Sequence, residues 1–207
     1  AQVNIIALDH NYGYAEGHNR ALESVTEPLV ILLNNDVQVS AQWTLPIITA
    51  FEQNSSLAAA QPKILNLNQP SHFEYAGAAG GFLDQLGYPF CQGRIFDTLE
   101  QDTKQYDQST ELFWASGACL CLRHENFKKI EGFDIDPKIL YIEDRAFSIK
   151  AALLGLSFDA ANEIIGIKYY FSDSMSVADK SKWPRAGYHL WVKVKESVGD
   201  SYPKEIC

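Results

Sequence analysis

A short apolar run that ends in a polar turn is the feature that most constrains how this chain folds. Leu29 to Leu33 is an unbroken apolar segment, and Asn34-Asn35-Asp36 follows it directly. An apolar run of this length is typical of a strand buried on both faces by helices. We therefore expect an α/β fold with Asn34 to Asp36 at the carboxyl end of a buried strand, where open α/β sheets build their ligand crevices.

Hydrophobic periodicity predicts the neighbouring elements. Val3 to Leu8 is a second apolar run rich in β-branched residues, and the segment from Asn11 to Asn19 leads from a loop into a helix. With the Leu29 to Leu33 strand, these segments predict a βαβ unit. Further strands are expected at residues 57–60, 73–76, 81–83, 112–114, 118–123, near 158 and at 164–167. Further helices are expected from 44, at 124–130, from 143 to 154 and at the C-terminus around 188–198.

Composition and charge exclude several classes of function. The 207 residues are 46% hydrophobic and 21% charged, which is enough apolar material for the core of one domain. The formal net charge of −9, with no basic cluster longer than a pair, argues against binding to nucleic acid or to an anionic membrane. No apolar run approaches the roughly 20 residues of a membrane span. Four cysteines without CxxC spacing predict reduced thiols and a cytoplasmic protein.

The Asn34-Asn35-Asp36 turn has two interpretations. Mg²⁺ and Mn²⁺ prefer oxygen ligands and commonly take one or two carboxylates together with substrate phosphates, so a single Asp among amides can hold such an ion. The alternative is an ordinary turn, because Asn and Asp favour turns. The tripeptide alone is compatible with both.

Two further segments are candidates for chemistry. Glu143 and Asp144 open a predicted helix, where they either stabilise the helix dipole or supply a general base. Adjacent helical residues point in different directions, so we expect separate roles for the two acids. The Trp114 to Ala118 segment sets small residues after an aromatic ring, which allows a ligand to approach the backbone, although core packing explains the pattern equally well.

These motifs follow one another in an order that resembles a known family. The series comprises Asn11-x-Gly13-x-Ala15-x-Gly17-x-Asn19, Leu32-Leu33-Asn34-Asn35-Asp36, Pro62-Lys63-Ile64, Tyr75-Ala76-Gly77, Trp114-Ala115-Ser116-Gly117-Ala118, Arg123, Gly132-Phe133-Asp134 and Tyr141-Ile142-Glu143-Asp144. It resembles the family-two glycosyltransferases of GT-A fold, particularly their rhamnosyltransferase-like bacterial members. The resemblance implies a GT-A-like (Rossmann-like) mixed central sheet flanked by helices over residues 1–176, with residues 177–207 as a C-terminal helical extension packed on it.

The resemblance also implies an activity and a set of site residues. The activity is inverting transfer of a sugar from a nucleotide-diphosphate donor to a hydroxyl of a saccharide or lipid-linked acceptor, in cell-surface polysaccharide synthesis. Asp36 matches the last acid of the family's DxD-type motif and would bind a divalent metal, Mg²⁺ or Mn²⁺. Asp144 matches the Asp of the Glu-Asp motif and would deprotonate the acceptor. The residues expected to bind donor and acceptor are Asn19, Asn34, Trp114, Ser116, Gly117 and Glu143.

The sequence departs from the family pattern at three places. The family begins with a strand and helix that hold the nucleotide base, and the segment matching here starts after them, so we expect a chain truncated at its N-terminus. Arg145-Ala146-Phe147 replaces an acid-containing continuation of the helix, and Lys168 stands where a metal-binding His is common.

These departures leave two alternatives open: a non-catalytic remnant that acts as a binding or partner-interaction domain and, less favoured, a GT-A-like nucleotidyltransferase. An exposed sheet edge beside the missing strand predicts a homodimer or poor solubility. Any membrane association is expected to be peripheral, at the inner face, through the acceptor or partners.

Overall fold

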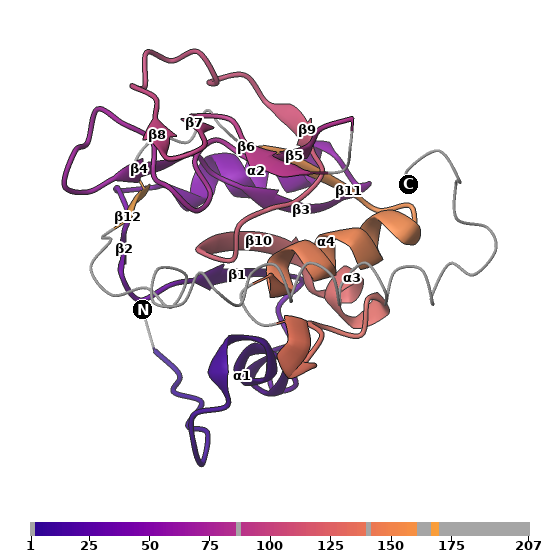
Figure 1. The fold of residues 1–207 in the computed structure, drawn as a ribbon. Coiled ribbons are helices and arrows are strands. Elements are labelled where there is room, and N and C mark those ends of the chain that lie inside the picture. Colours follow the sequence, from indigo (N-terminus) through magenta and orange to yellow (C-terminus); the bar gives the residue numbers. More distant parts are fainter. Residues whose placement is uncertain (1–2, 86–87, 140–141, 161–166, 170–207) are drawn as a thin grey trace.

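A five-stranded mixed sheet forms the centre of the molecule. The computed structural model describes residues 3–85, 88–139, 142–160 and 167–169, and its sheet has the strand order β1-β10-β3-β11-β9 (Figure 1). These strands are β1 (Leu29–Leu33), β3 (Leu57–Gln61), β9 (Thr110–Leu112), β10 (Cys119–Arg123) and β11 (Ser157–Ala160). β11 runs parallel to β3, and the other neighbours are antiparallel. The expected mixed sheet flanked by helices is confirmed.

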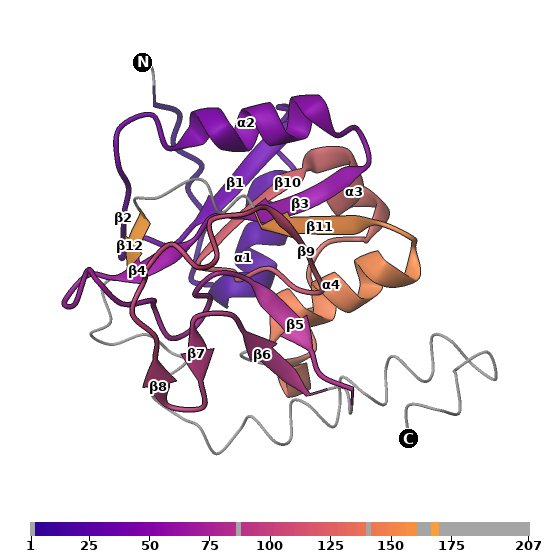
Figure 2. The ribbon, with the colours of Figure 1, turned by 90° about the horizontal axis from the view of Figure 1, so that it is seen from above.

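Helices cover both faces of this sheet. They are α1 (Gly13–Leu22), α2 (Thr44–Gln53), α3 (His124–Lys129) and α4 (Glu143–Leu153), with a 3-10 turn at Pro137–Ile139. Alternate side chains of β10 serve the two faces, as the pleat of a strand requires. Leu120 and Leu122 join a core with residues of α1, α3 and α4, whereas Cys119 and Cys121 join one with residues of α2. Figure 2 shows α2 and α4 on opposite sides of the sheet.

A second layer of short strands stands beside the main sheet. β12 (Ile167–Tyr169) pairs with both β2 (Val37–Gln38) and β4 (Ile64–Asn66). Two hairpins follow, β5 (Gly81–Leu83) with β6 (Pro89–Cys91), and β7 (Arg94–Ile95) with β8 (Thr98–Leu99). This excursion has its own apolar core, which includes Phe73, Cys91 and Trp114. The part of the chain with the weakest periodicity is therefore held by a satellite core.

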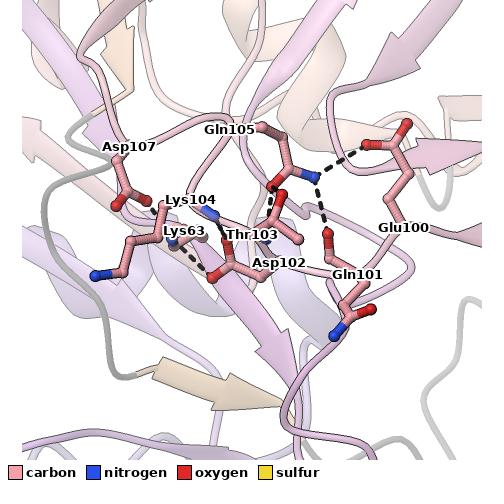
Figure 3. Close-up of polar contacts among 8 residues, drawn as sticks. All are labelled: Lys63, Glu100, Gln101, Asp102, Thr103, Lys104, Gln105 and Asp107. Atoms are coloured by element: carbon pink, nitrogen blue, oxygen red, sulfur yellow. Dashed lines mark hydrogen bonds and ion pairs between the residues drawn. The ribbon is translucent and has the colours of Figure 1, made fainter.

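A buried ion-pair cluster also anchors the excursion. The Lys63 side chain is fully buried, and its Nζ lies 2.8 Å from Asp102 Oδ2 and 2.5 Å from Asp107 Oδ1 (Figure 3). Asp102 also accepts the backbone N–H of Lys104 through its other oxygen, at 2.9 Å. An ammonium group removed from water needs such partners, because an unpaired buried charge is costly. The cluster ties the 102–107 loop to the segment between β3 and β4.

The strand predicted at Val3 to Leu8 is wrong. Val3 to Leu8 forms no strand, and its apolar side chains are exposed, with Val3 at 82% and Ile5 at 87%. A strand needs a hydrogen-bonding neighbour, and no segment in the described part of the chain lies beside this one as a partner. Among the described residues, β1 accordingly stands at the edge of the sheet with β10 as its one partner, so the predicted parallel βαβ unit does not form there.

Apart from the predicted strand at 73–76, the remaining described elements agree with the periodicity except in their bounds. α1 begins at Gly13, inside the predicted loop, and Leu154 lies just beyond α4 and is exposed. Residues 73–76 form no strand, although Phe73 makes one isolated bridge to Leu65. β12 begins at Ile167. Residues 164–166 of the last predicted strand and the predicted C-terminal helix lie outside the described residues.

Two expectations from the composition concern a membrane-spanning segment and the state of the cysteines. Among the helices of the described part, none combines the length and apolarity of a membrane span. The cysteines in that part, Cys91, Cys119 and Cys121, are buried and free.

Candidate active site

The site is built where β1 ends and β10 begins. Their antiparallel register sets Leu33 opposite Cys119. The N–H of Asn34, just past β1, donates to the carbonyl of Ala118 at 3.0 Å. The Asn34 to Asp36 turn therefore lies against the segment that contains Ser116 and Gly117, which joins two of the predicted motifs.

The third motif reaches the same segment through Asp144. Gly117 N–H donates to Asp144 Oδ2 at 3.1 Å, and the N–H of Arg145 donates to Oδ1 at 2.8 Å. Burial raises the pKa of Asp144 above its ordinary value, while the Arg145 charge and these N–H donors oppose the rise. A carboxylate with a raised pKa is a stronger base than an exposed Asp, which suits proton abstraction.

The space around residue 117 leaves no room for a side chain, so a glycine is needed there. The Tyr14 hydroxyl donates to the Gly117 carbonyl at 2.8 Å, and a Cβ added to Gly117 would stand 2.6 Å from that hydroxyl oxygen. Burial and the negative charges of Asp144 and Glu143 raise the pKa of Tyr14 well above its ordinary value. Both acids of the Glu-Asp pair therefore lie close to α1, and Tyr14 stays a neutral donor.

The Trp114 ring is buried beside the first turn of α4. The indole is 1% exposed, and the Arg145 guanidinium lies 4.8 Å from its ring centroid. A Cβ on Gly81 would come within 2.1 Å of this ring, so the glycine makes room for it. The indole Nε1 is buried and has no hydrogen-bond partner among the described residues. An unpaired buried donor is uncommon and is a candidate contact for a ligand.

Asp36 has a comparable unpaired atom. Its Oδ1 is buried without a hydrogen-bond partner in the described part of the chain. Those residues contain no group of three or more His, Cys, Asp or Glu that could enclose an ion. A single unpaired carboxylate oxygen, Asp36 Oδ1, is compatible with a cation whose other ligands are phosphate oxygens and water. The donor set therefore fits a hard divalent ion bound together with a phosphate-containing ligand.

Comparison with known proteins identifies the family. Residues 1–111 match the family model described as Glycosyl transferase family 2, which is more than half of the chain. The chain belongs to glycosyl transferase family 2. No curated protein matches its sequence.

A solved structure agrees with the fold of this family-two chain. A crystal structure of GalNAc-T7 with UDP, GalNAc and Mn²⁺ matches with a TM-score of 0.63 and 13% sequence identity. The match covers 96% of this chain and 38% of that one. At this identity the likeness shows the GT-A-like fold alone, and the chain spans well under half of the length of that protein.

The predicted site residues of the family-two chain do not all gather in one place. Most of them lie on three segments that hydrogen bonds or close charges connect. These residues are Asn34, Asp36, Trp114, Ser116, Gly117, Glu143 and Asp144. Asn19 is engaged elsewhere: its Nδ2 donates to the Phe133 carbonyl at 2.9 Å, and its Oδ1 accepts the Phe133 N–H at 2.9 Å. This pair of bonds ties α1 to the 132–133 loop. Nucleotide binding by Asn19 stays a prediction.

Sequence reasoning overlooked residues that support the site. Tyr14 lies inside the Asn11 to Asn19 motif, but its contact with Gly117 spans 103 positions of the chain. Gln61 is fully buried and accepts the N–H of Ser116 at 2.7 Å. A polar residue at the end of an apolar strand, the signal that identified Asp36, was also present at Gln61.

Proposed function

We propose that this chain transfers a sugar from a nucleotide-diphosphate donor to a hydroxyl acceptor with inversion at the anomeric carbon. Family membership supports sugar transfer in general, and the site geometry supports the finer assignment. The observation that carries it is the single backbone segment 116–118, which is hydrogen-bonded to the turn of Asp36 on one side and to Asp144 on the other. Asp36, the proposed metal ligand, and Asp144, the proposed base, therefore lie on either side of residues 116–118.

In this proposal Asp144 is the base. Its carboxylate accepts the proton of the acceptor hydroxyl as the hydroxyl oxygen bonds to the anomeric carbon, and the bond from that carbon to the diphosphate oxygen breaks. The nucleoside diphosphate leaves with the bonding electron pair. One displacement inverts the anomeric centre and needs only one base. Arg145, held over Trp114, places a positive charge beside the base, and this charge opposes the rise of the Asp144 pKa that burial causes.

Asp36 would be the residue that holds a divalent ion at the diphosphate end of the donor. Such an ion, Mg²⁺ or Mn²⁺, would supply positive charge to offset the negative charge that develops on the leaving diphosphate. The residue that this chain contributes is Asp36, with Asn34 in the same turn. Trp114, Ser116, Gly117 and Glu143 are proposed to line the donor sugar and acceptor. The expected acceptor is a saccharide or lipid-linked hydroxyl, in polysaccharide synthesis at the cytoplasmic face of the membrane.

Calorimetric titration with UDP and dTDP, with and without Mn²⁺, tests the phosphate side. We expect binding that depends on the metal and is lost in Asp36→Asn. The exposed acid Asp97, on the hairpin between β7 and β8, offers the matched control Asp97→Asn, which should bind as the parent does. Metal-dependent binding that is equal in all three chains would refute the role of Asp36.

Donor hydrolysis and transfer test the base. Asp144→Asn should bind nucleotide normally and lose at least about 100-fold in kcat, the scale of a general base. A chain that unfolds cooperatively but binds neither nucleotide would instead favour the alternative of a non-catalytic binding domain.

A further inference from the structure

Gln61 bridges two segments of the site from a fully buried position. Its Oε1 accepts the N–H of Ser116 at 2.7 Å, and its Nε2 donates to the carbonyl of Gly77 at 3.0 Å. The same Nε2 lies 3.4 Å from the Pro62 carbonyl. A backbone N–H needs an acceptor and a carbonyl needs a donor, so these partners determine which way the amide points. Every polar atom of the buried side chain is thereby satisfied.

The Gly77 side of the bridge is a fixed support. The Glu74 carboxylate accepts the Ala76 N–H at 2.6 Å, which closes the 74–77 turn on itself. Two backbone bonds of 2.9 Å, from Glu74 N to the Ile64 carbonyl and from Ile64 N to the Ala78 carbonyl, hold this turn on β4. The turn also abuts the site segment closely, because a Cβ on Gly77 would stand 2.7 Å from Ser116 Cβ.

The Ser116 side of the bridge leads to the base. Gln61 holds the N–H of Ser116, and the next N–H along the chain, that of Gly117, donates to Asp144 Oδ2. The Ser116 hydroxyl accepts the Ala118 N–H at 3.2 Å, which folds the segment tightly. A shift of Ser116 therefore moves the Gly117 N–H relative to Asp144.

We propose that Gln61 is a positioning residue, which fixes the 116–117 backbone against the 74–77 turn so that the Gly117 N–H meets the Asp144 carboxylate. This inference rests on the proposed function for the role of Asp144 as base. Gln61 touches no reacting atom and acts only through the backbone. Without it, Asp144 loses part of a hydrogen bond that favours its ionised form, and its proton affinity rises.

The surroundings of Asp144 contain other groups that titrate or carry charge. They are Arg145 and Glu143 on α4, Tyr14 on α1 and Cys91 on β6. None of them is bonded to Gln61 in the described structure. A change in the titration of Asp144 caused by substitution of Gln61 therefore reports on the 116–117 backbone.

The sequence permits a direct measurement, because only one serine is followed by a glycine. Labelling with carbonyl-¹³C serine and ¹⁵N glycine yields a single correlated amide, that of Gly117. Its proton shift followed against pH gives the midpoint of Asp144, its hydrogen-bond acceptor. In Gln61→Met we expect this midpoint to rise by about half to one pH unit. We expect kcat to fall about tenfold, with the donor KM unchanged and the acidic limb of the kcat profile moved to higher pH.

Two further variants keep the test decisive. The added methyl group of Gly77→Ala would press on Ser116 from the side of the 74–77 turn, and it should also raise the midpoint of Asp144. This variant tests the proposal if Gln61→Met does not fold. Ile47→Val, a buried change on α2, controls for a general loss of stability and should leave the midpoint in place. An unchanged midpoint in a folded Gln61→Met or Gly77→Ala chain overturns the proposal.

Failure of the proposed function gives a different result. If the parent chain transfers no sugar but the Gly117 midpoint still rises in Gln61→Met, the positioning of Asp144 stands and the assignment of Asp144 as a base falls. The amide measurement needs neither donor nor acceptor, so the two conclusions separate.

Discussion

Glu74 makes the free energy of unfolding depend on pH, and the substitution Glu74→Gln should remove this dependence. The side chain is 1% exposed, and its Oε1 is buried with no hydrogen-bond partner in the described part of the chain. Burial raises the pKa of Glu74 from 4.5 to about 7, although N–H donors of the 75–77 turn and the Arg94 charge oppose the rise. The folded chain thus favours the protonated carboxyl.

The sign and size of the effect follow from these two pKa values. Between pH 4.5 and about 7 the folded state holds a proton that the unfolded state has lost, so the free energy of unfolding falls as pH rises. At about 1.4 kcal/mol per pKa unit, the full loss is about 3 kcal/mol. About 2.5 kcal/mol of it develops between pH 5 and pH 8. Below pH 4.5 the stabilisation is fully present.

Glu74→Gln replaces the carboxyl with a neutral group of the same shape. The amide oxygen can still accept the Ala76 N–H, and any constant cost of the new NH₂ group is the same at every pH. Urea unfolding of both chains from pH 5 to pH 8, followed by tryptophan fluorescence, should therefore show the variant gaining about 2.5 kcal/mol relative to the parent. The exposed Glu52 offers the control Glu52→Gln, which should follow the parent. Parallel pH profiles for parent and Glu74→Gln would refute the reasoning.

Three further predictions concern the excursion, the thiols and the sheet edge. Lys63→Met should lower the free energy of unfolding by about 3 to 5 kcal/mol in urea, because Asp102 and Asp107 lose their shared cation. The control Lys104→Met, at an exposed position, should change this free energy very little. Equal losses in the two variants would contradict a stabilising role of the cluster. Burial raises the pKa of Cys91 to about 11, so maleimide labelling at pH 7.5 should leave it unmodified until urea is added, and rapid native labelling seen by mass spectrometry would contradict this. The edge of β1, which has no strand beside it in the described part of the chain, should produce dimers in sedimentation velocity, and a monodisperse monomer would count against that.

Local pattern was sufficient for the elements whose burial it reflects. Short unbroken apolar runs predicted β1, β3 and β10 as strands, and apolar residues at a spacing of 3.6 predicted α2 and α4 as helices. The same rule failed at Val3 to Leu8. Its composition is that of a strand, but a strand exists only where another strand satisfies its backbone, and that depends on the rest of the fold.

The site divides in the same way between sequence and tertiary structure. Residue chemistry and motif order were enough to nominate Asp36, Gly117 and Asp144, because carboxylates and a glycine at element ends carry a local signal. The sequence could not reveal that one backbone segment joins them, or that Gln61 holds this segment across 55 positions of the chain. Hydrogen bonds between distant segments leave no period in the sequence, and burial of Gln61, Lys63 and Glu74 follows only from packing. The hydrogen bonds of Gln61, the ion pairs of Lys63 and the raised pKa of Glu74 are therefore properties of the folded chain.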